Sequence, residues 1–459
     1  MGTTPGSIHH LGRSRAGRGG GAAPGRAVRV NRRRLALMTD AGVTWAGTHT
    51  FAAPQLVVAR SIDEAVAAVR DCVDSGAPVR ALGTRHSFND IADTTGTLVT
   101  LTEVPADPVL DAAAHTVTVG AGTRYGILAS WLEAHGWALH NMGSLPHISV
   151  AGATQTGTHG SGITNGCLTT AVRALEYIDA NGDVRTVRAG DPDFPALAVG
   201  LGAFGVITRV TLAIEPTYTV AQSIWRGIGW DTLLDSPKAL LSAAYSLSVF
   251  TRWGTPELEQ VWVKAKVGVD PALAPDWMGG AAMTHHTLLA EGNPADLTDH
   301  DGTPGPWLTR LPHFRLDGTP SNGNEIQTEY VVDLADAAAA LRAVRALAEA
   351  IDPLLLITEL RTIAADELWL SGAYRRDTLA IHFTWRPLAQ EVAAVLPAVE
   401  EALAPFAARP HWGKWHAFDA TRLDEVHPRL GAARDVFERL DPAGRFANDH
   451  LRRLGVRAS

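Results

Sequence analysis

The segment ALGTRHSFND, residues 81–90, decides the fold that we expect for this chain. Apolar Val79, Ala81 and Leu82 run as a short buried strand into Gly83, and polar residues then surround His86. The polar residues are Arg85, Ser87, Asn89 and Asp90, with Phe88 among them. A lone histidine at such a corner is explained by hydrogen bonds to nearby backbone. Its interpretation therefore depends on the segments that surround it.

The residues on either side of this segment predict a region of mixed strands and helices, from about 45 to 216. Ser61 and Glu64 have the spacing of a helix N-terminal capping box, the apolar residues that follow recur at helical spacing, and Gly76 suits the end of that helix. Strands are expected at 97–101, 115–123 and 201–216, and a second helix at 124–136. Residues 172–187 read as a hairpin that turns at Asn181-Gly182.

The character of the sequence changes at about residue 218. Helical patterns at 334–351 and 389–406 alternate with strand-like stretches at 353–363 and 378–385. This order predicts an α+β region in which helices cover one antiparallel sheet.

Composition limits the class of protein. The 459 residues are 46% hydrophobic and 19% charged, and no apolar run approaches the ~20 residues of a membrane helix. Residues 1–39 hold eight arginines and no acid, so the remainder is strongly acidic, which argues against a nucleic-acid partner. With only Cys72 and Cys167, no disulfide framework is possible, and we expect a monomer in the cytoplasm.

The Arg- and Gly-rich residues 1–41 are expected to be a disordered extension. NRRRLALM resembles a twin-arginine export signal, but the apolar stretch Leu35–Met38 is too short for one. A basic nucleic-acid tail is a second alternative. The third, which we favour, is a start codon placed too early, with Met38 as the natural beginning.

A glycine-rich stretch, SVAGATQTGTHGSG at 149–162, is the second candidate site. Its glycines let backbone N–H groups approach an anion, and its hydroxyls add donors, so a diphosphate is the natural ligand. It is neither a Walker A loop nor a Rossmann fingerprint, and a purely structural glycine-rich turn is the alternative.

Polar residues in apolar strands form the third candidate site. Glu359 and Arg361 are two residues apart, as are His382 and Thr384, so each pair shares one face of its strand. Burying such groups is unfavourable unless they are satisfied, so either ion pairs or a hydroxyl-rich ligand is indicated. RPHWGKWH adds His411 and Lys414. No metal site is expected, because neither His411 and His416 nor the pair His285–His286 has a carboxylate or cysteine to complete a ligand set.

Seven motifs in order resemble the alditol (xylitol/sorbitol) oxidases, which belong to the vanillyl-alcohol-oxidase-type flavoproteins near the aldonolactone oxidases. They are ALGTRHSFND, NMGSLPHISVAGATQTGTHGSG, LGAFGVIT, ELRT, HFTW, HWGK and DPAGRFAN, within residues 42–452. The resemblance implies an α+β fold with a two-part FAD-binding domain of the PCMH type at 42–217. It also implies an α+β substrate (cap) domain at 218–409, with an antiparallel sheet flanked by helices. A C-terminal segment, 410–459, returns to the flavin.

The resemblance also implies one covalent bond from His86 to FAD, with Cys167 too far along the chain for a second. Relatives often have glycine where this chain has Arg85. The residues implied to bind FAD are Gly83, Thr84, Arg85, His86, Ser87, Phe88, Asn89, Ser144, Ser149, Gly152, Thr156, Gly157, Thr158, His159, Ile207 and His411. Among these, Ile207 is expected near the adenine and His411 near the isoalloxazine.

By the same resemblance, the chain oxidises the terminal C1 hydroxyl of an alditol and reduces O2 to H2O2. The implied substrate-binding residues are Ser144, Glu359, Arg361, Thr384 and Lys414. Arg361 and Lys414 are expected to activate the reacting hydroxyl, Glu359 to hold Arg361, and His382 to accept the proton. Gly143 is implied to leave dioxygen access to the flavin. An aldonolactone oxidase, a polyol dehydrogenase with another acceptor and a non-catalytic flavin or carbohydrate carrier remain alternatives.

Overall fold

The computed structural model describes residues 36–38, 40–283, 293–319 and 323–458. Contacts group Leu35–Ser459 into one unit. The predicted extension lies almost wholly outside the described residues, except that Ala36–Met38 form strand β1 and pair with a later strand. The pair His285–His286 also lies outside them.

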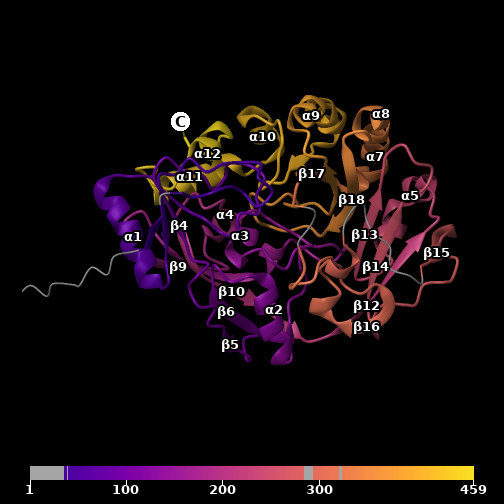
Figure 1. Ribbon diagram of the computed structural model, residues 1–459, viewed down its shortest axis with the longest axis horizontal. Helices are drawn as coiled ribbons and strands as arrows, with labels where there is room; N and C mark the ends of the chain where they lie inside the picture. The colour runs from indigo at the N-terminus through magenta and orange to yellow at the C-terminus, as the bar shows by residue number, and fades with distance from the viewer. Residues whose placement is uncertain (1–35, 39, 284–292, 320–322, 459) are drawn as a thin grey trace, which may run out of the picture. The chain divides into compact units, whose positions relative to one another are not determined.

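Two sheets are built from residues before 214 (Figure 1). The first is mixed, in the order β1 (Ala36–Met38), β2 (Gln55–Val58), β4 (Thr97–Thr100), β3 (Val79–Ala81). The second is antiparallel, in the order β5 (Val109–Asp111), β6 (Thr116–Gly120), β10 (Val206–Ala213), β8 (Val172–Ile178), β9 (Val184–Arg188). A separate short pair joins β7 (Trp137–Ala138) to β11 (Glu215–Pro216).

The third sheet contains nine antiparallel strands, all from residues after 218. Its order is β15 (Ala281–Ala282), β12 (Thr219–Arg226), β14 (Gln260–Lys266), β13 (Ser246–Thr251), β18 (Leu355–Ile363), β19 (Thr378–Trp385), β17 (Ile326–Asp333), β20 (Arg409–Pro410), with β16 (Asp301–Pro306) beside β12. The predicted antiparallel sheet is therefore present.

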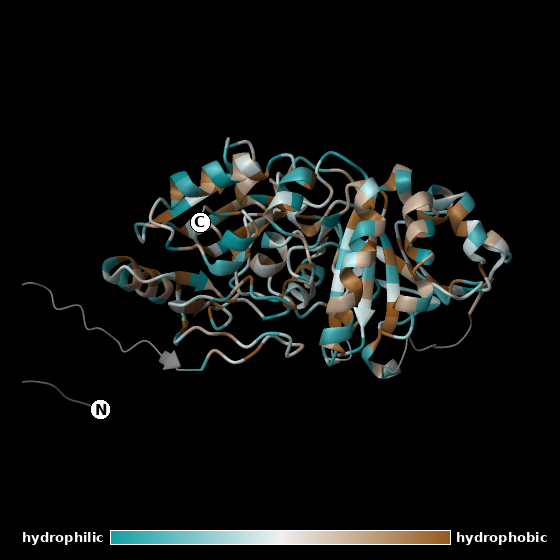
Figure 2. Cartoon of the chain, turned by 90° about the horizontal axis from the view of Figure 1, so that it is seen from above, coloured by the Kyte–Doolittle hydropathy of each residue, from teal (hydrophilic) through white to brown (hydrophobic). Residues whose placement is uncertain are grey.

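Helices cover these sheets, and their ends follow the expected sequence signals. They are α1 (Ile62–Ser75), α2 (Tyr125–Ala134), α3 (Val150–Gln155), α4 (Phe194–Leu197), α5 (Trp230–Asp235), α6 (Pro237–Leu241), α7 (Ala337–Arg345), α8 (Ala348–Ile351), α9 (Ala389–Leu403), α10 (Ala420–Val426), α11 (Leu430–Leu440) and α12 (Asp449–Arg453). Ser61 accepts a hydrogen bond from the N–H of Glu64, and Gly76 ends α1 at φ 77°, as predicted. Helices α7 and α9 contact each other beside the third sheet, and Figure 2 shows them with both apolar and polar residues.

Register in the third sheet sets the position of the polar side chains. Strand β19 lies between β17 and β18, so that His382 is paired with Glu329 on one side and with Glu359 on the other. Glu329, Glu359 and His382 are all buried. The sheet thus carries a cluster of ionisable groups in its interior, on the side away from the aromatic residues Trp385 and Phe383.

Candidate active site

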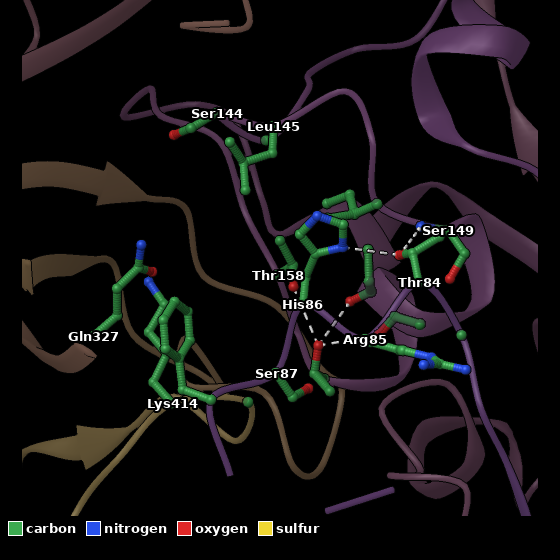
Figure 3. A pocket seen from close by; sticks show the side chains of 18 of the residues that line it. Thr84, Arg85, His86, Ser87, Ser144, Leu145, Ser149, Thr158, Gln327 and Lys414 are labelled. Carbon is green, nitrogen blue, oxygen red and sulfur yellow. Dashed lines mark hydrogen bonds between the residues drawn. The ribbon is translucent and has the colours of Figure 1, made fainter. Parts of the chain in front are cut away.

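One cavity of about 330 Å³ contains nearly all the residues that the sequence singled out. Its walls come from the β3 loop, the glycine-rich stretch with α3, the large sheet and the segment after β20. Figure 3 shows Gln327 and Lys414 on one side of the cavity, facing His86 and Thr84. The cavity therefore joins residues as far apart in the sequence as Thr44 and Lys414.

His86 is held with one ring nitrogen bonded and the other without a partner. Its Nδ1 lies 3.1 Å from Oγ1 of Thr84, and its ring stacks on Trp45 with centroids 5.6 Å apart. Nε2 is buried and has no hydrogen-bond partner among the residues that the structure describes. Burial, with the charges of His147 and Arg124, lowers the pKa of His86 to about 4. The imidazole is therefore neutral at pH 7 and keeps a lone pair on one nitrogen.

Arg85, which precedes this histidine, has a left-handed backbone with φ 65°. Such a conformation is unfavourable for a residue with a side chain and is one that glycine adopts readily. The guanidinium lies 6.0 Å from the centre of the Phe51 ring and extends away from Lys414 in Figure 3. The arginine therefore keeps the loop conformation at a cost in backbone strain.

The glycine-rich wall leaves room for a group that needs close approach to the backbone. A Cβ atom added at Gly83 or at Gly152 would lie 2.7 Å from Oγ of Ser149, which is closer than real contacts allow. The N–H of Ser149 donates to Oγ1 of Thr84, which ties this wall to the histidine loop. A cradle of small residues and hydroxyls, beside a buried nitrogen without a partner, fits a dinucleotide with a diphosphate.

The segment after β20 closes over the histidine loop. The N–H of Phe88 donates to the carbonyl of Gly413 at 2.7 Å. The amide of Asn89 donates to the carbonyls of Trp412 and Lys414, both at 2.9 Å. These bonds fix Lys414 relative to His86, although more than 320 residues separate them in the chain.

On the side of the sheet, Ser144 meets the pair from β18. The guanidinium of Arg361 donates to Oγ of Ser144 at 3.0 Å, and its Nε lies 3.4 Å from Oε1 of Glu359. Burial alone would raise the pKa of Glu359, but the charge of Arg361 and the hydrogen bond from His313 hold it below its usual range. Glu359 is thus a carboxylate at neutral pH, as a partner of arginine requires.

A second carboxylate, Glu329, is the centre of the buried charge cluster. It contacts the ammonium of Lys414 and Nε2 of His159, and its Oε2 lies 2.9 Å from Nδ1 of His382 and 3.9 Å from Arg361. Although burial opposes ionisation, Lys414 and His159 keep the pKa of Glu329 well below its usual range. Glu329 therefore supplies the negative charge that keeps Lys414 and Arg361 close together.

Lys414 and His382 are joined directly as well. Nζ of Lys414 lies 2.6 Å from Nδ1 of His382, and Nε2 of His382 lies 3.1 Å from the hydroxyl of Thr384. Burial and the Lys414 charge lower the pKa of His382 to about 4. Burial also lowers the pKa of Lys414, which Glu329 raises again. A neutral imidazole next to a buried ammonium can take part in proton transfer.

The cavity brings together all the predicted site residues but one. Gly157 does not line it: this residue has φ 67°, follows α3 and faces a separate cavity of about 20 Å³. Gly143 lines the main cavity, and a Cβ atom there would meet Ile148, Thr158 and His159 at 3.5 Å or more, an ordinary contact.

Sequence reasoning missed Glu329 on β17 and the two polar residues before it, Glu325 and Gln327. Glu325, Gln327 and Glu329 alternate with apolar or small residues, which is the same period-two signal that identified Glu359 with Arg361. It also missed His313, whose Nε2 lies 2.7 Å from Glu359 and which comes from a loop without a recognisable pattern.

No helix among the described residues is long and apolar enough to cross a membrane.

Comparison with known proteins agrees with this arrangement. Residues 53–188 match a family model described as FAD binding domain, and residues 322–454 match one described as D-arabinono-1,4-lactone oxidase. The chain is 41% identical over 425 residues to alditol oxidase of a Streptomyces species, with 91% of this chain and 99% of that protein covered. It is 29% identical to L-gulono-1,4-lactone dehydrogenase of Mycobacterium tuberculosis, over 89% of this chain and 98% of that protein. The crystal structure of cholesterol oxidase from B. sterolicum has the same fold, with a TM-score of 0.75, 14% identity and coverage of 94% of this chain and 100% of that one.

Proposed function

This chain belongs to the alditol oxidase family, and from that premise we propose that it is an FAD-dependent oxidase of the terminal hydroxyl of alditols such as xylitol or sorbitol. One observation carries the proposal: Ser144, Arg361, Glu359 and Lys414 converge on the same cavity as His86 and the glycine cradle. Hydroxyl-binding side chains therefore face the place where the histidine loop holds the cofactor.

FAD fits the cavity by the chemistry of its walls. Gly83, Gly152 and Ser149 would hold the diphosphate, while Ile207 and His411 would lie against the two ring systems. When bound, FAD supplies the two-electron acceptor for the C1–H bond and is restored by dioxygen, which leaves as hydrogen peroxide.

The protein's own groups prepare the substrate for that transfer. The ammonium of Lys414 and the guanidinium of Arg361 bind the reacting hydroxyl and favour its alkoxide form. Glu359 holds Arg361 and accepts a hydrogen bond from a further hydroxyl, and Ser144 and Thr384 bind inner hydroxyls of the polyol. A site made of such bonds rejects molecules that lack the hydroxyls, because its buried polar groups are then left unpaired.

His382 is the proposed proton acceptor. Its imidazole is neutral at pH 7, since its pKa lies at about 4, and Nε2 reaches the cavity through the hydroxyl of Thr384 at 3.1 Å. In the tautomer that can accept, the ring's own proton is on Nδ1 and is donated to Oε2 of Glu329 at 2.9 Å. Thr384 then donates its hydroxyl proton to Nε2 and takes up the proton of the C1 hydroxyl, and the positive charge that forms on the ring is balanced by Glu329.

We further propose that FAD is attached covalently, through His86 alone. The buried, unpartnered Nε2 and the neutral imidazole support a nucleophilic ring at this position. Cys167 is a poor second site, because burial raises the pKa of its thiol to about 12 and the residue does not line the main cavity.

The test is a substrate panel with oxygen uptake and peroxide detection. We expect xylitol and sorbitol to bleach the flavin anaerobically and to yield one peroxide per oxygen consumed. Turnover of aldonolactones in place of polyols would favour the lactone oxidase alternative, and bleaching without oxygen uptake would favour a dehydrogenase. For the covalent bond, acid precipitation should leave yellow colour in the pellet of the wild type and none in that of His86→Ala.

A further inference from the structure

Lys264 is a fully buried lysine that lies behind the wall of the cavity without lining it. It is on β14, and its Nζ donates to the carbonyl of Leu311, to that of Pro312 at 3.4 Å and to Nδ1 of His313 at 3.1 Å. Within the described part of the chain, no carboxylate lies within 4 Å of this ammonium. A buried ammonium without a carboxylate is unfavourable, which makes it a candidate for a functional role.

The three contacts of Lys264 determine where His313 carries its proton. An ammonium has three donors and no lone pair, so Nδ1 of His313 must accept. The proton of the neutral imidazole is then on Nε2, which donates to Oε1 of Glu359 at 2.7 Å. The charge on Lys264 thus makes one tautomer of His313 obligatory.

A neutral Lys264 cannot restrict His313 to this tautomer. It has two donors and one lone pair, so it cannot satisfy both carbonyls and also donate to Nδ1. The tautomer with the proton on Nδ1 becomes accessible, and in it the lone pair of Nε2 faces Glu359, which loses its donor.

The imidazole of His313 has little freedom to turn instead. Its edge packs against the rings of Trp262 and Phe250, with centroids 5.1 and 5.5 Å apart. The backbone N–H of His313 donates to the carbonyl of Ser144 at 3.0 Å, which fixes the residue that carries the ring. What can change at Glu359 is therefore the position of the proton on the imidazole, and not the orientation of the ring.

We propose that Lys264 is a positioning residue for polyol oxidation: through the tautomer of His313 it maintains a hydrogen-bond donor to Glu359, and so fixes this carboxylate where it binds a substrate hydroxyl and Arg361. The inference rests on the proposed function and deepens it. Lys264 does not contact the substrate, so its effect appears in substrate binding more than in the chemical step.

The protonation of Lys264 changes in an accessible range of pH. Burial lowers its pKa to about 7, with Glu359 acting to raise it and Arg361 to lower it. His313 is the titratable group in contact, and its pKa of about 4 keeps it neutral above that pH. On the neighbouring strands Gln222 and Ser246 are paired with Lys264, and neither titrates. The ammonium is lost as pH rises through 7, so KM for the polyol should rise there.

The kinetic experiment uses Lys264→Met in the FAD-loaded protein, with xylitol as the probe. At pH 6.5 we expect KM to rise about tenfold, the equivalent of one charge-assisted hydrogen bond, and kcat to change by no more than about threefold. The rise of the wild-type KM above pH 7 should be absent from the variant. The matched control is Lys266→Met, on the same strand, whose Nζ lies 3.2 Å from Glu215 and 3.8 Å from the centre of the Tyr218 ring.

A double-mutant cycle separates positioning from general stability. If Lys264 acts through His313, Lys264→Met adds little to KM once His313 is replaced by leucine. Equal increases of KM in both backgrounds, or a KM of Lys264→Met within twofold of the wild type, would overturn the proposal.

Histidine ¹⁵N NMR of the resting protein gives a readout that does not need turnover. We expect His313, assigned by its loss in His313→Leu, to carry its proton on Nε2 at pH 6.5 and to populate the other tautomer at pH 8.5 and in Lys264→Met. If the tautomer of His313 is the same at both pH values and in Lys264→Met, the proposal is overturned even if the protein oxidises polyols. If the tautomers change as expected but polyols are not oxidised, only the proposed function is overturned. If Lys264→Met does not fold, the wild-type titration alone decides.

Discussion

Replacing Glu329 by glutamine tests the charge cluster beneath the proposed substrate site. The change preserves shape and removes the carboxylate that contacts Lys414, His159 and His382. Burial and Arg361 both lower the pKa of Lys414, and Glu329 is the main group that raises it. Without this carboxylate the ammonium loses its proton at a lower pH, so a smaller fraction of Lys414 binds the reacting hydroxyl as a cation.

The magnitude follows from what Lys414 does in the transition state. Removing one preorganised donor from a developing oxyanion costs about 100- to 1,000-fold in kcat, or ~3–4 kcal/mol. Leaving the buried cations without their carboxylate lowers the free energy of unfolding by ~3 kcal/mol. This loss is at the low end of the range for broken buried ion pairs, because Lys414 can lose its proton and become neutral. The high-pH limb of kcat/KM should also move to lower pH.

The assay is anaerobic flavin reduction by xylitol in a stopped-flow instrument, across pH 6–10, with urea unfolding alongside. The matched control is Glu400→Gln, which removes another buried carboxylate, bonded to the hydroxyl of Tyr330 and the N–H of Ala417. This control should lose stability and keep its kinetics. A rate of flavin reduction in Glu329→Gln within threefold of the wild type, with the same pH profile, would refute the reasoning.

Three further outcomes follow. Gly143→Ala should fold normally, because the added Cβ meets only ordinary contacts. It should slow the reaction of the reduced enzyme with O2 several-fold without changing the rate of flavin reduction. An unchanged oxidation rate in stopped-flow would remove the proposed role of Gly143 in oxygen access. Ser144→Ala removes the acceptor 3.0 Å from Arg361 and should lower kcat/KM for xylitol about tenfold, unlike Ser75→Ala on the exposed end of α1. Burial opposes ionisation of Asp90, but His450 and Arg453 lower its pKa. The stability that Asp90 adds is therefore present above pH ~4 and is lost as pH falls further. Asp90→Asn should flatten the acid side of the curve of unfolding free energy against pH, measured with urea, and an unchanged acid side would contradict the pairing.

Local pattern predicted the elements and part of the site. The capping residues of α1, the glycine at its end and the alternation in β18 and β19 are short-range signals, and each gave the correct element. The hairpin was also predicted, although its loop extends from Asp179 to Asp183 around Asn181-Gly182. Helix α3 was missed, because glycine within six residues hides its helical pattern.

The charge cluster could not be read from one sequence, because it depends on strand register. His382 lies between Glu329 and Glu359 only because β19 pairs with both β17 and β18 in one particular alignment. Lys264 and His313 come from a strand and a loop about 50 residues apart, and neither belongs to a motif. The motif-based expectation found residues that line the cavity, whereas the residues that hold them in place could be identified only from the packed sheet.

The bonds from Asn89 to the carbonyls of Trp412 and Lys414 have a consequence for biosynthesis. A ribosome releases residues 80–90 long before it reaches residue 412, and until then the histidine loop lacks the carbonyls that fix it. The loop can take its final form only when almost the entire polypeptide has emerged, because closing so large a loop is slow and depends on contacts at its far end. We therefore expect FAD to bind late in maturation, and chains that terminate before residue 412 should be recovered colourless.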